Sequence, residues 1–70
     1  MPDGNTYPVT EIVGTSTEGI DDAIRNAISA AHETLHNLDW FEVTKISGHL
    51  EGGDVAHFQV MIKIGFRYEA

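Results

Sequence analysis

The chain has 70 residues, no cysteine and a formal net charge of -7, from 11 acidic and 4 basic side chains. So few Lys and Arg residues argue against a nucleic-acid or anionic-membrane surface, whose affinity rests on cationic contacts. The lack of cysteine excludes disulfides, thiolate zinc sites and cysteine nucleophiles. A core this small usually needs a disulfide, a metal or oligomerisation to be stable. Because disulfides are excluded and no metal cage is evident, we expect the chain to self-associate.

Nothing in the sequence predicts export or membrane insertion. No apolar run approaches the roughly 20 residues of a membrane helix. The start, MPDGNTYPVT, lacks the basic-then-apolar layout of a signal peptide. We therefore predict a cytoplasmic protein with a single domain over residues 1–70, of which residues 1–5 form a flexible start.

The first predicted element is a short strand over residues 6–13, with Val9 on one face and Ile12 on the other. Pro8 has no amide proton to donate, so this end of the strand is expected at a sheet edge or outside the ladder. Gly14 is predicted to end the strand.

A helix start follows at once. Thr15 and Glu18 have the spacing of a capping box, and Ser16 and Thr17 are alternative N-caps. From residue 18 to about 37, apolar side chains recur at steps of three and four, as on one side of a helix. They are Ile20, Ala23, Ile24, Ala27, Ile28, Ala31, Leu35 and Leu38. Such a one-sided helix is expected to lie on a sheet.

Two long strands are predicted over residues 40–50 and 55–68, joined by the hairpin turn Glu51-Gly52-Gly53-Asp54. The last strand alternates strictly, which gives it one apolar face and one mixed face. The apolar face holds Ala56, Phe58, Val60, Ile62, Ile64 and Phe66, and the other holds His57, Gln59, Met61, Lys63, Gly65 and Arg67.

The predicted fold class is therefore α+β, in the order β-α-β-β, with a three-stranded antiparallel sheet packed around one helix. One helix covers one side of a sheet, so the opposite face is where we look for function. Two strands of this length also exceed what one helix can cover, and we expect subunit contacts to use the excess.

Five blocks of the sequence, in this order and spacing, resemble the dodecin family. The similarity covers about residues 7–69. The blocks are Glu11-Ile12-Val13-Gly14-Thr15-Ser16, Leu38-Asp39-Trp40-Phe41-Glu42-Val43, Gly48-His49-Leu50-Glu51, Phe58-Gln59-Val60 and Ile64-Gly65-Phe66-Arg67.

The resemblance implies a hollow homododecamer of cubic 23 symmetry that binds flavins in stacked pairs. Dodecins are regarded as flavin storage, buffering or photoprotective proteins and not as enzymes. The family's tryptophan, which stacks on the flavin ring, corresponds to Trp40. The glutamine that hydrogen-bonds the polar edge of that ring corresponds to Gln59.

The ligand expected from the resemblance is FMN, riboflavin or FAD, with FMN favoured. Dodecins that prefer FMN often carry an arginine at the position of Ser47, and this chain does not. Arg67 remains as a phosphate contact, with Lys45 and His49 as weaker candidates. Some family members also bind coenzyme A at another site, so a coenzyme A-binding or structural shell with a vestigial flavin site is the alternative function.

Other interpretations of these residues stay open. A lone tryptophan such as Trp40 is otherwise typical of a core or a subunit interface, and Arg67 is equally a candidate for an ion pair between subunits. His32 and His36 have the i, i+4 spacing of helical metal ligands, but without a third ligand they are interpreted as surface histidines. Glu42 and Glu51 are interpreted as solvated or ion-paired carboxylates. An enzyme, either a flavin-dependent reductase or a His/Glu hydrolase, is the least favoured function, because the sequence has no dinucleotide fingerprint, nucleophile elbow or metal motif.

Overall fold

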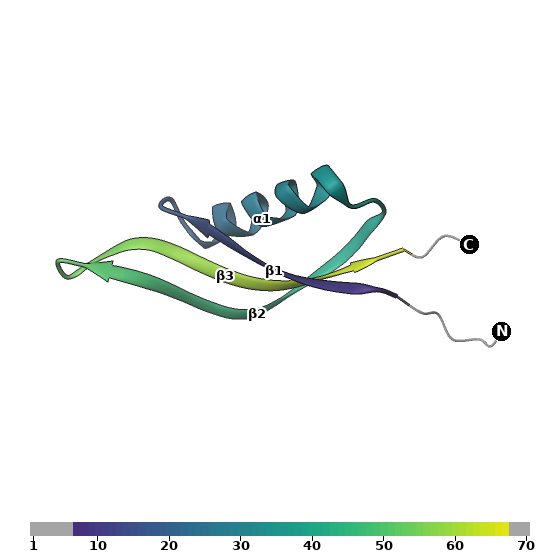
Figure 1. Cartoon of the computed structure of the whole chain (residues 1–70). Helices are drawn as coiled ribbons and strands as arrows, with labels where there is room; N and C mark the ends of the chain where they lie inside the picture. The colour runs from purple at the N-terminus through teal and green to yellow at the C-terminus, as the bar shows by residue number, and fades with distance from the viewer. Residues whose placement is uncertain (1–6, 68–70) are drawn as a thin grey trace.

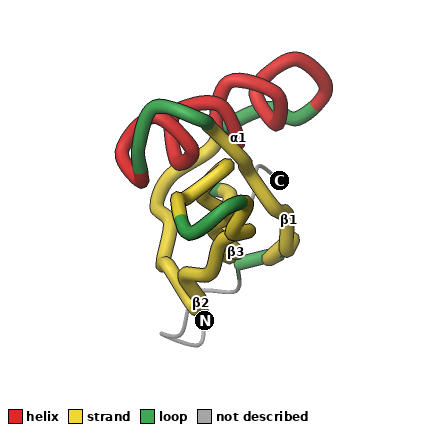
Figure 2. The backbone as a smooth tube through the Cα atoms, turned by 90° about the vertical axis from the view of Figure 1, so that its left-hand side faces the viewer, coloured by secondary structure: helices red, strands yellow, loops and turns green. Residues whose placement is uncertain are grey.

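The computed structural model describes residues 7–67, and the predicted flexible start at residues 1–5 lies outside them. The elements are β1 (Val9–Ser16), α1 (Ile20–Thr34), β2 (Leu38–Glu51) and β3 (Asp54–Phe66). They form a three-stranded sheet with β3 in the middle, antiparallel to both neighbours. α1 forms a second layer along one side of the strands (Figures 1 and 2). This is the predicted α+β fold in the predicted order.

The core lies between α1 and the middle strand. Three alanines spaced four apart on α1 face three β-branched residues of β3, and all six are buried: Ala23, Ala27, Ala31, Val60, Ile62 and Ile64. Small side chains at this spacing let the helix lie close to the sheet. Burying each large aliphatic side chain contributes about 1.5–3 kcal/mol to the free energy of folding. The predicted one-sided helix is confirmed, and the three alanines are the buried residues of its sheet-facing side.

Gly14 does not end β1, so that prediction is wrong: the strand continues to Ser16. Gly14 pairs with Val60 inside the sheet, directly beneath the helix. A Cβ at position 14 would meet the carbonyl oxygen of Ala23 and lie 2.7 Å from the Cβ of Ala27. The glycine is there because α1 crosses β1 too closely for any side chain.

The helix start also differs from the predicted capping box. The N-cap position is Gly19, which forms no side-chain cap. Ser16, at the end of β1, accepts hydrogen bonds at Oγ from the backbone N–H groups of Glu18 (2.8 Å) and Gly19 (3.4 Å). The same hydroxyl donates to Oδ2 of Asp22 in the first helical turn, at 2.7 Å. The alternative cap Ser16 thus satisfies the Glu18 amide that Thr15 was expected to cap, and the Gly19 amide as well.

The helix is shorter at its C-terminal end than predicted. It ends at Thr34, and the C-cap residue Leu35 is already extended. Asn37 has φ 61°, in the left-handed region that asparagine tolerates better than most residues. This turn reverses the chain and starts β2 at Leu38, which packs on the core from the sheet. His36 lies outside the helix for the same reason.

The β2–β3 hairpin extends beyond both β1 and α1 (Figure 1). Gly52 and Gly53 form its turn at φ 59° and 85°, between the paired residues Glu51 and Asp54, as predicted. α1 packs on β1 and β3 and leaves β2 largely uncovered. Large apolar side chains are therefore exposed along β2 and the hairpin, namely Trp40, Phe41, Ile46, Leu50 and Val55. Exposed apolar surface of this extent marks a contact or binding surface.

Within residues 7–67, no helix combines the length and the apolar character that crossing a membrane requires.

We expect Gly14→Ala to lower the free energy of unfolding by about 1–3 kcal/mol, because the added methyl forces α1 away from β1. Denaturant unfolding at a fixed chain concentration measures this. Gly19→Ala adds the same methyl where nothing lies within 4 Å of it, and should cost distinctly less. Equal losses in the two variants would show that the helix does not need its close approach at Gly14.

Candidate functional site

The sheet face turned away from α1, called the open face below, carries the residues of interest. Residues of β3 alternate, so Gln59, Met61, Lys63 and Gly65 point away from the buried Val60, Ile62 and Ile64. Residues directly opposite one another in antiparallel strands share a face. The register therefore adds to the open face Trp40, Glu42, Lys45, Ser47 and His49 from β2, and Val9, Glu11, Val13 and Thr15 from β1.

Trp40 lies flat on the open face. It is opposite Gly65, and a Cβ at position 65 would meet Cε2, Nε1 and Cζ2 of the indole. The ring therefore covers the bare backbone of β3, while 40% of the residue remains exposed. A register shift between Leu38 and Trp40 turns the tryptophan to this face. The result is an indole held against the sheet by one side, with its outer side accessible.

Gly65 is a functional position that the sequence pattern did not identify. The alternation places it only on the mixed face of the last strand, whereas the structure shows that its missing side chain makes room for the indole. The useful signal would have been a glycine directly opposite the single tryptophan. That signal depends on the strand register, and the register shift beside Trp40 hides it from the sequence.

Gln59 lies in the same face but in a different row. It is flanked by Thr15 of β1 and Ser47 of β2. Gln59 is partly exposed. Among residues 7–67 its amide forms no hydrogen bond within the chain. Its carbonyl oxygen and amide N–H groups are thus available to a bound molecule.

Trp40 and Gln59 are far apart within one chain. The Trp40 row is at Gly65, six residues along β3 from Gln59. At about 3.3 Å per residue, this corresponds to roughly 20 Å along the strand. A flat three-ring ligand stacked on the indole cannot reach the amide of the same chain. The two residues can act on one molecule only if two chains contribute them.

The predicted phosphate contacts also divide between the Gln59 end and the Trp40 end of the open face. Ser47 is in the Gln59 row, with Lys45 and His49 in the rows on either side of it. A second register shift, between Val43 and Lys45, brings Lys45 to the open face. The extra residue, Thr44, donates its hydroxyl to the Met61 carbonyl at 3.1 Å.

Arg67 lies at the other end, just beyond the Trp40 row. Its guanidinium is 3.6 Å from Oδ1 of Asp39 and is 69% exposed. Its backbone N–H donates to the Asn37 carbonyl at 2.8 Å. The sequence interpretation left an ion pair between subunits open, and the structure adds one within the chain. The exposed guanidinium can still contact an anion beside the indole.

The helical histidines and the two glutamates considered in the sequence are not brought together in the described part of the chain. His32 is on α1, but His36 lies beyond the end of the helix, so the i, i+4 geometry is lost. Residues 7–67 contain no group of three or more His, Cys, Asp or Glu side chains that could hold a metal ion. Glu42 lies opposite Lys63, far along β2 from Glu51, which is at the hairpin turn. These two carboxylates are not an acid–base pair.

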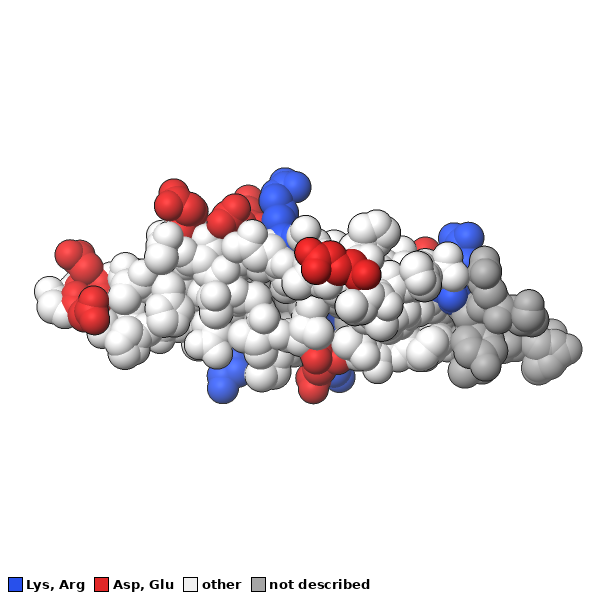
Figure 3. All heavy atoms as spheres, turned by 45° about the horizontal axis from the view of Figure 1, so that its top comes forward, with Lys and Arg blue, Asp and Glu red and all other residues white. Residues whose placement is uncertain are grey.

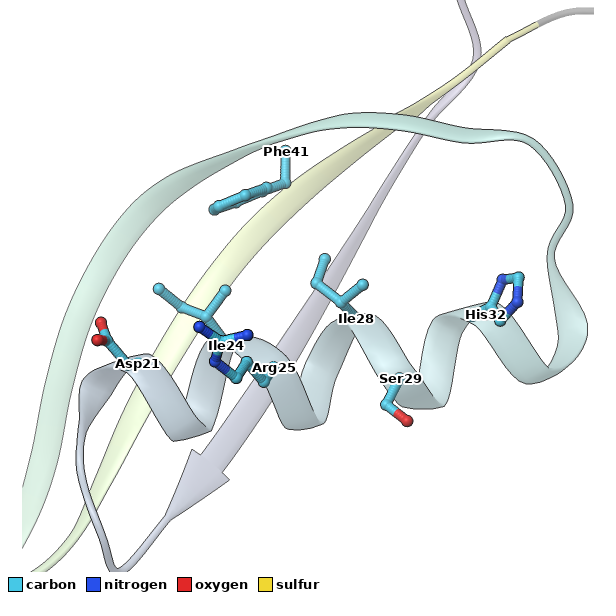
Figure 4. Close-up of a pocket in the computed structure, with 7 residues that line it drawn as sticks. All are labelled: Asp21, Ile24, Arg25, Ile28, Ser29, His32 and Phe41. Carbon is cyan, nitrogen blue, oxygen red and sulfur yellow. The ribbon is translucent and has the colours of Figure 1, made fainter.

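A groove of about 610 Å³ lies on the other side of β2, between that strand and α1. In Figure 4, Phe41 projects from β2 toward Ile24 and Ile28 of the helix, and Asp21 and Arg25 lie near one end. No predicted ligand contact lines this groove.

Acidic side chains are spread over the face drawn in Figure 3, with few basic ones among them. This face has no basic stripe of the kind that binds nucleic acid.

The dodecin family profile matches residues 6–69. The chain belongs to the dodecin family. Its sequence is 46% identical over 66 residues to the dodecin of Thermus thermophilus, covering 94% of this chain and 96% of that one. These two matches confirm the resemblance seen in the sequence. The dodecin family is one of small flavin-binding proteins.

Solved dodecin structures share the fold of this chain. The dodecin of Streptomyces coelicolor is 56% identical, covers 100% of this chain and 99% of its own, and superposes with a TM-score of 0.89. The Streptomyces davaonensis dodecin is 57% identical with the same TM-score, over 97% of this chain and 100% of its own. The likeness to dodecin structures indicates a homo-oligomeric assembly.

Replacing Gly65 should displace the indole. In Gly65→Ala the new methyl occupies the place of the Trp40 ring, so the ring must swing away from the sheet. We expect red-shifted tryptophan emission and stronger quenching by acrylamide, and Trp40 is the only source of that signal. Gly19→Ala adds the same methyl where nothing lies within 4 Å of it and should leave the emission as it is. An unchanged spectrum in Gly65→Ala would contradict the seating of the indole on Gly65.

Proposed function

We propose that this dodecin stores and sequesters flavin, which it binds without transforming it. The observation that carries the proposal is the Trp40 indole, which covers Gly65 on one side and is accessible on the other. An aromatic ring held in this way is a prepared stacking surface, because little further ordering is needed when a ligand binds. Membership of a flavin-binding family supports the choice of ligand.

The chemistry of the two residues suits a flavin. The isoalloxazine ring is large, flat and electron-poor, and indole is the largest electron-rich ring among side chains, so offset stacking is favourable. The Gln59 amide offers one acceptor and two donor protons, which match the alternating carbonyl and N–H groups of the pyrimidine edge. Electron transfer from the stacked indole would also quench the excited flavin, which gives a photoprotective role without a general base or nucleophile.

The site is shared between chains in this proposal. The roughly 20 Å between Trp40 and Gln59 along the sheet excludes one flavin from touching both in a single chain. Trp40 of one chain and Gln59 of a neighbour would hold each ligand. Pairs of flavins stacked between subunits of a hollow dodecamer with 23 symmetry satisfy this requirement. The exposed apolar side chains of β2 would provide part of the subunit contacts.

FMN is the flavin that we favour, with riboflavin and FAD as the other ligands. Arg67 lies at the Trp40 end of the open face, where its exposed guanidinium can contact a phosphate. Lys45 and His49 lie near Gln59 and, with the Ser47 hydroxyl, are the candidates at that end. The Arg67–Asp39 ion pair lowers the net positive charge beside the indole. We therefore propose only a modest preference for FMN over riboflavin.

Titrating the apo protein into riboflavin, FMN and FAD tests the function directly. We expect saturable quenching of flavin fluorescence by all three ligands, because each stacks the same ring on Trp40. FMN should bind most tightly. If no flavin binds, the coenzyme A-binding or structural shell becomes the leading function, and titration with coenzyme A decides between those two.

Substitutions of Trp40 and Gln59 should have different effects on flavin binding and on the quenching of bound flavin. Trp40→Ala removes the stacking surface and should weaken binding roughly tenfold to a hundredfold, the range for aromatic stacking platforms. Gln59→Ala should weaken binding less and leave any bound flavin quenched. His32→Ala, on the helix, is the matched control and should bind like the parent chain. Size-exclusion chromatography of each variant shows whether the assembly persists, and tight binding by Trp40→Ala would rule out this site.

Mixing subunits tests whether one site uses two chains. Trp40→Ala chains still carry Gln59, and Gln59→Ala chains still carry Trp40. If the two are unfolded and refolded together, mixed assemblies should regain tight sites at contacts where the intact residues meet. Each variant refolded alone gives the baseline. No recovery in the mixture would place both residues in the same chain's site, against the distance along β3.

A further inference from the structure

Two histidines lie directly opposite one another near the end of the hairpin. His49 of β2 pairs with His57 of β3, and their rings are stacked with centroids 5.6 Å apart and planes at 21°. β1 pairs with β3 only as far as Phe58, so His57 lies just beyond the part of β3 that β1 accompanies. Both histidines therefore belong to the two-stranded part of the sheet, where the β2–β3 hairpin extends past the end of β1 (Figure 1).

Both imidazoles are open to ligands. His49 is exposed and His57 is partly exposed. Within residues 7–67, neither ring takes part in a hydrogen bond or an ion pair with another side chain. The neighbouring row toward the turn is apolar, formed by Leu50 and Val55. The fold thus places two nitrogen ligands side by side and gives them no partner in the chain.

We propose that His49 and His57 together chelate a divalent transition-metal ion of the class that prefers imidazole, such as Cu²⁺, Ni²⁺ or Zn²⁺. Directly opposite positions in antiparallel strands have Cβ atoms about 4.5–5.5 Å apart. Rotation of the side chains can therefore bring one nitrogen of each ring to the same ion. Two protein ligands leave the other coordination positions to water, so the site is open and not a closed structural zinc site. The net charge of -7 favours the approach of a cation.

The competing explanation is a purely structural pair, in which stacked rings stabilise the hairpin across the strands. Such a pair needs contact between rings but no free nitrogen, and it gives no measurable affinity for metal. The histidines at positions 32 and 36 provide an internal contrast. They have the sequence spacing of a helical pair, but α1 ends at Thr34 and leaves His36 outside it.

The test is calorimetric titration of the assembled, untagged and metal-stripped protein with Ni²⁺ and Cu²⁺, without flavin. We expect one ion per chain. His49→Asn and His57→Asn should each weaken binding roughly tenfold or more, because the second imidazole no longer acts at high effective concentration. His32→Asn, which removes a helical histidine, should bind like the parent. Electron paramagnetic resonance of the Cu²⁺ form should show two coordinated imidazole nitrogens.

Absence of binding in the parent protein would overturn the proposal, as would parent-like affinity in either strand variant. An equal loss in His32→Asn would also overturn it, because binding would then not depend on the strand pair. No step of the experiment uses flavin, so its result is independent of the proposed flavin function.

Discussion

The close contact between α1 and β1 is the feature on which the rest of the structure depends. Gly14 in the strand and the buried alanines of the helix let the two backbones approach closely. Because this contact holds the helix over β1 and β3, β2 is left largely uncovered. Apolar side chains of β2 such as Trp40, Phe41 and Ile46 are consequently exposed in a single chain. For a small chain without disulfides, these are the surfaces that an assembly can bury.

Irregularities in β2 decide which side chains share the open face. In a regular strand, successive side chains point to opposite faces of the sheet. The register shifts before Trp40 and Lys45 interrupt this alternation and so decide which face each of them joins. The first shift turns the indole onto Gly65, and the second aligns Lys45 with Ser47 on the Gln59 side. Side chains that recognise a ligand are thus placed by departures from the regular ladder, whereas the core is placed by its regularity.

The same distinction explains what the sequence could predict. Strict alternation in β3 and the three-and-four spacing of α1 predicted both core faces correctly, because burial imposes those periods. The hairpin followed from Gly52 and Gly53. The end of β1, the capping box at Thr15 and the end of α1 were wrong, because they depend on contacts between elements, whereas Ser16, the alternative cap, does bind the first amides. Trp40 and Gln59 were identified as site residues from the family resemblance. The position of the indole on Gly65 could not be predicted, because it depends on the strand register.

The separation of Trp40 from Gln59 has a thermodynamic consequence for the proposed function. A ligand held by two chains binds the assembled protein and not the isolated chain, so binding and assembly stabilise each other. Each flavin added would strengthen the contacts between subunits, and dissociation of the subunits would release the flavin. At a hundredfold excess of free ligand over its Kd, this linkage is worth about 2.7 kcal/mol per site. A store built in this way retains its contents for as long as its shell persists, without a separate lid or gate.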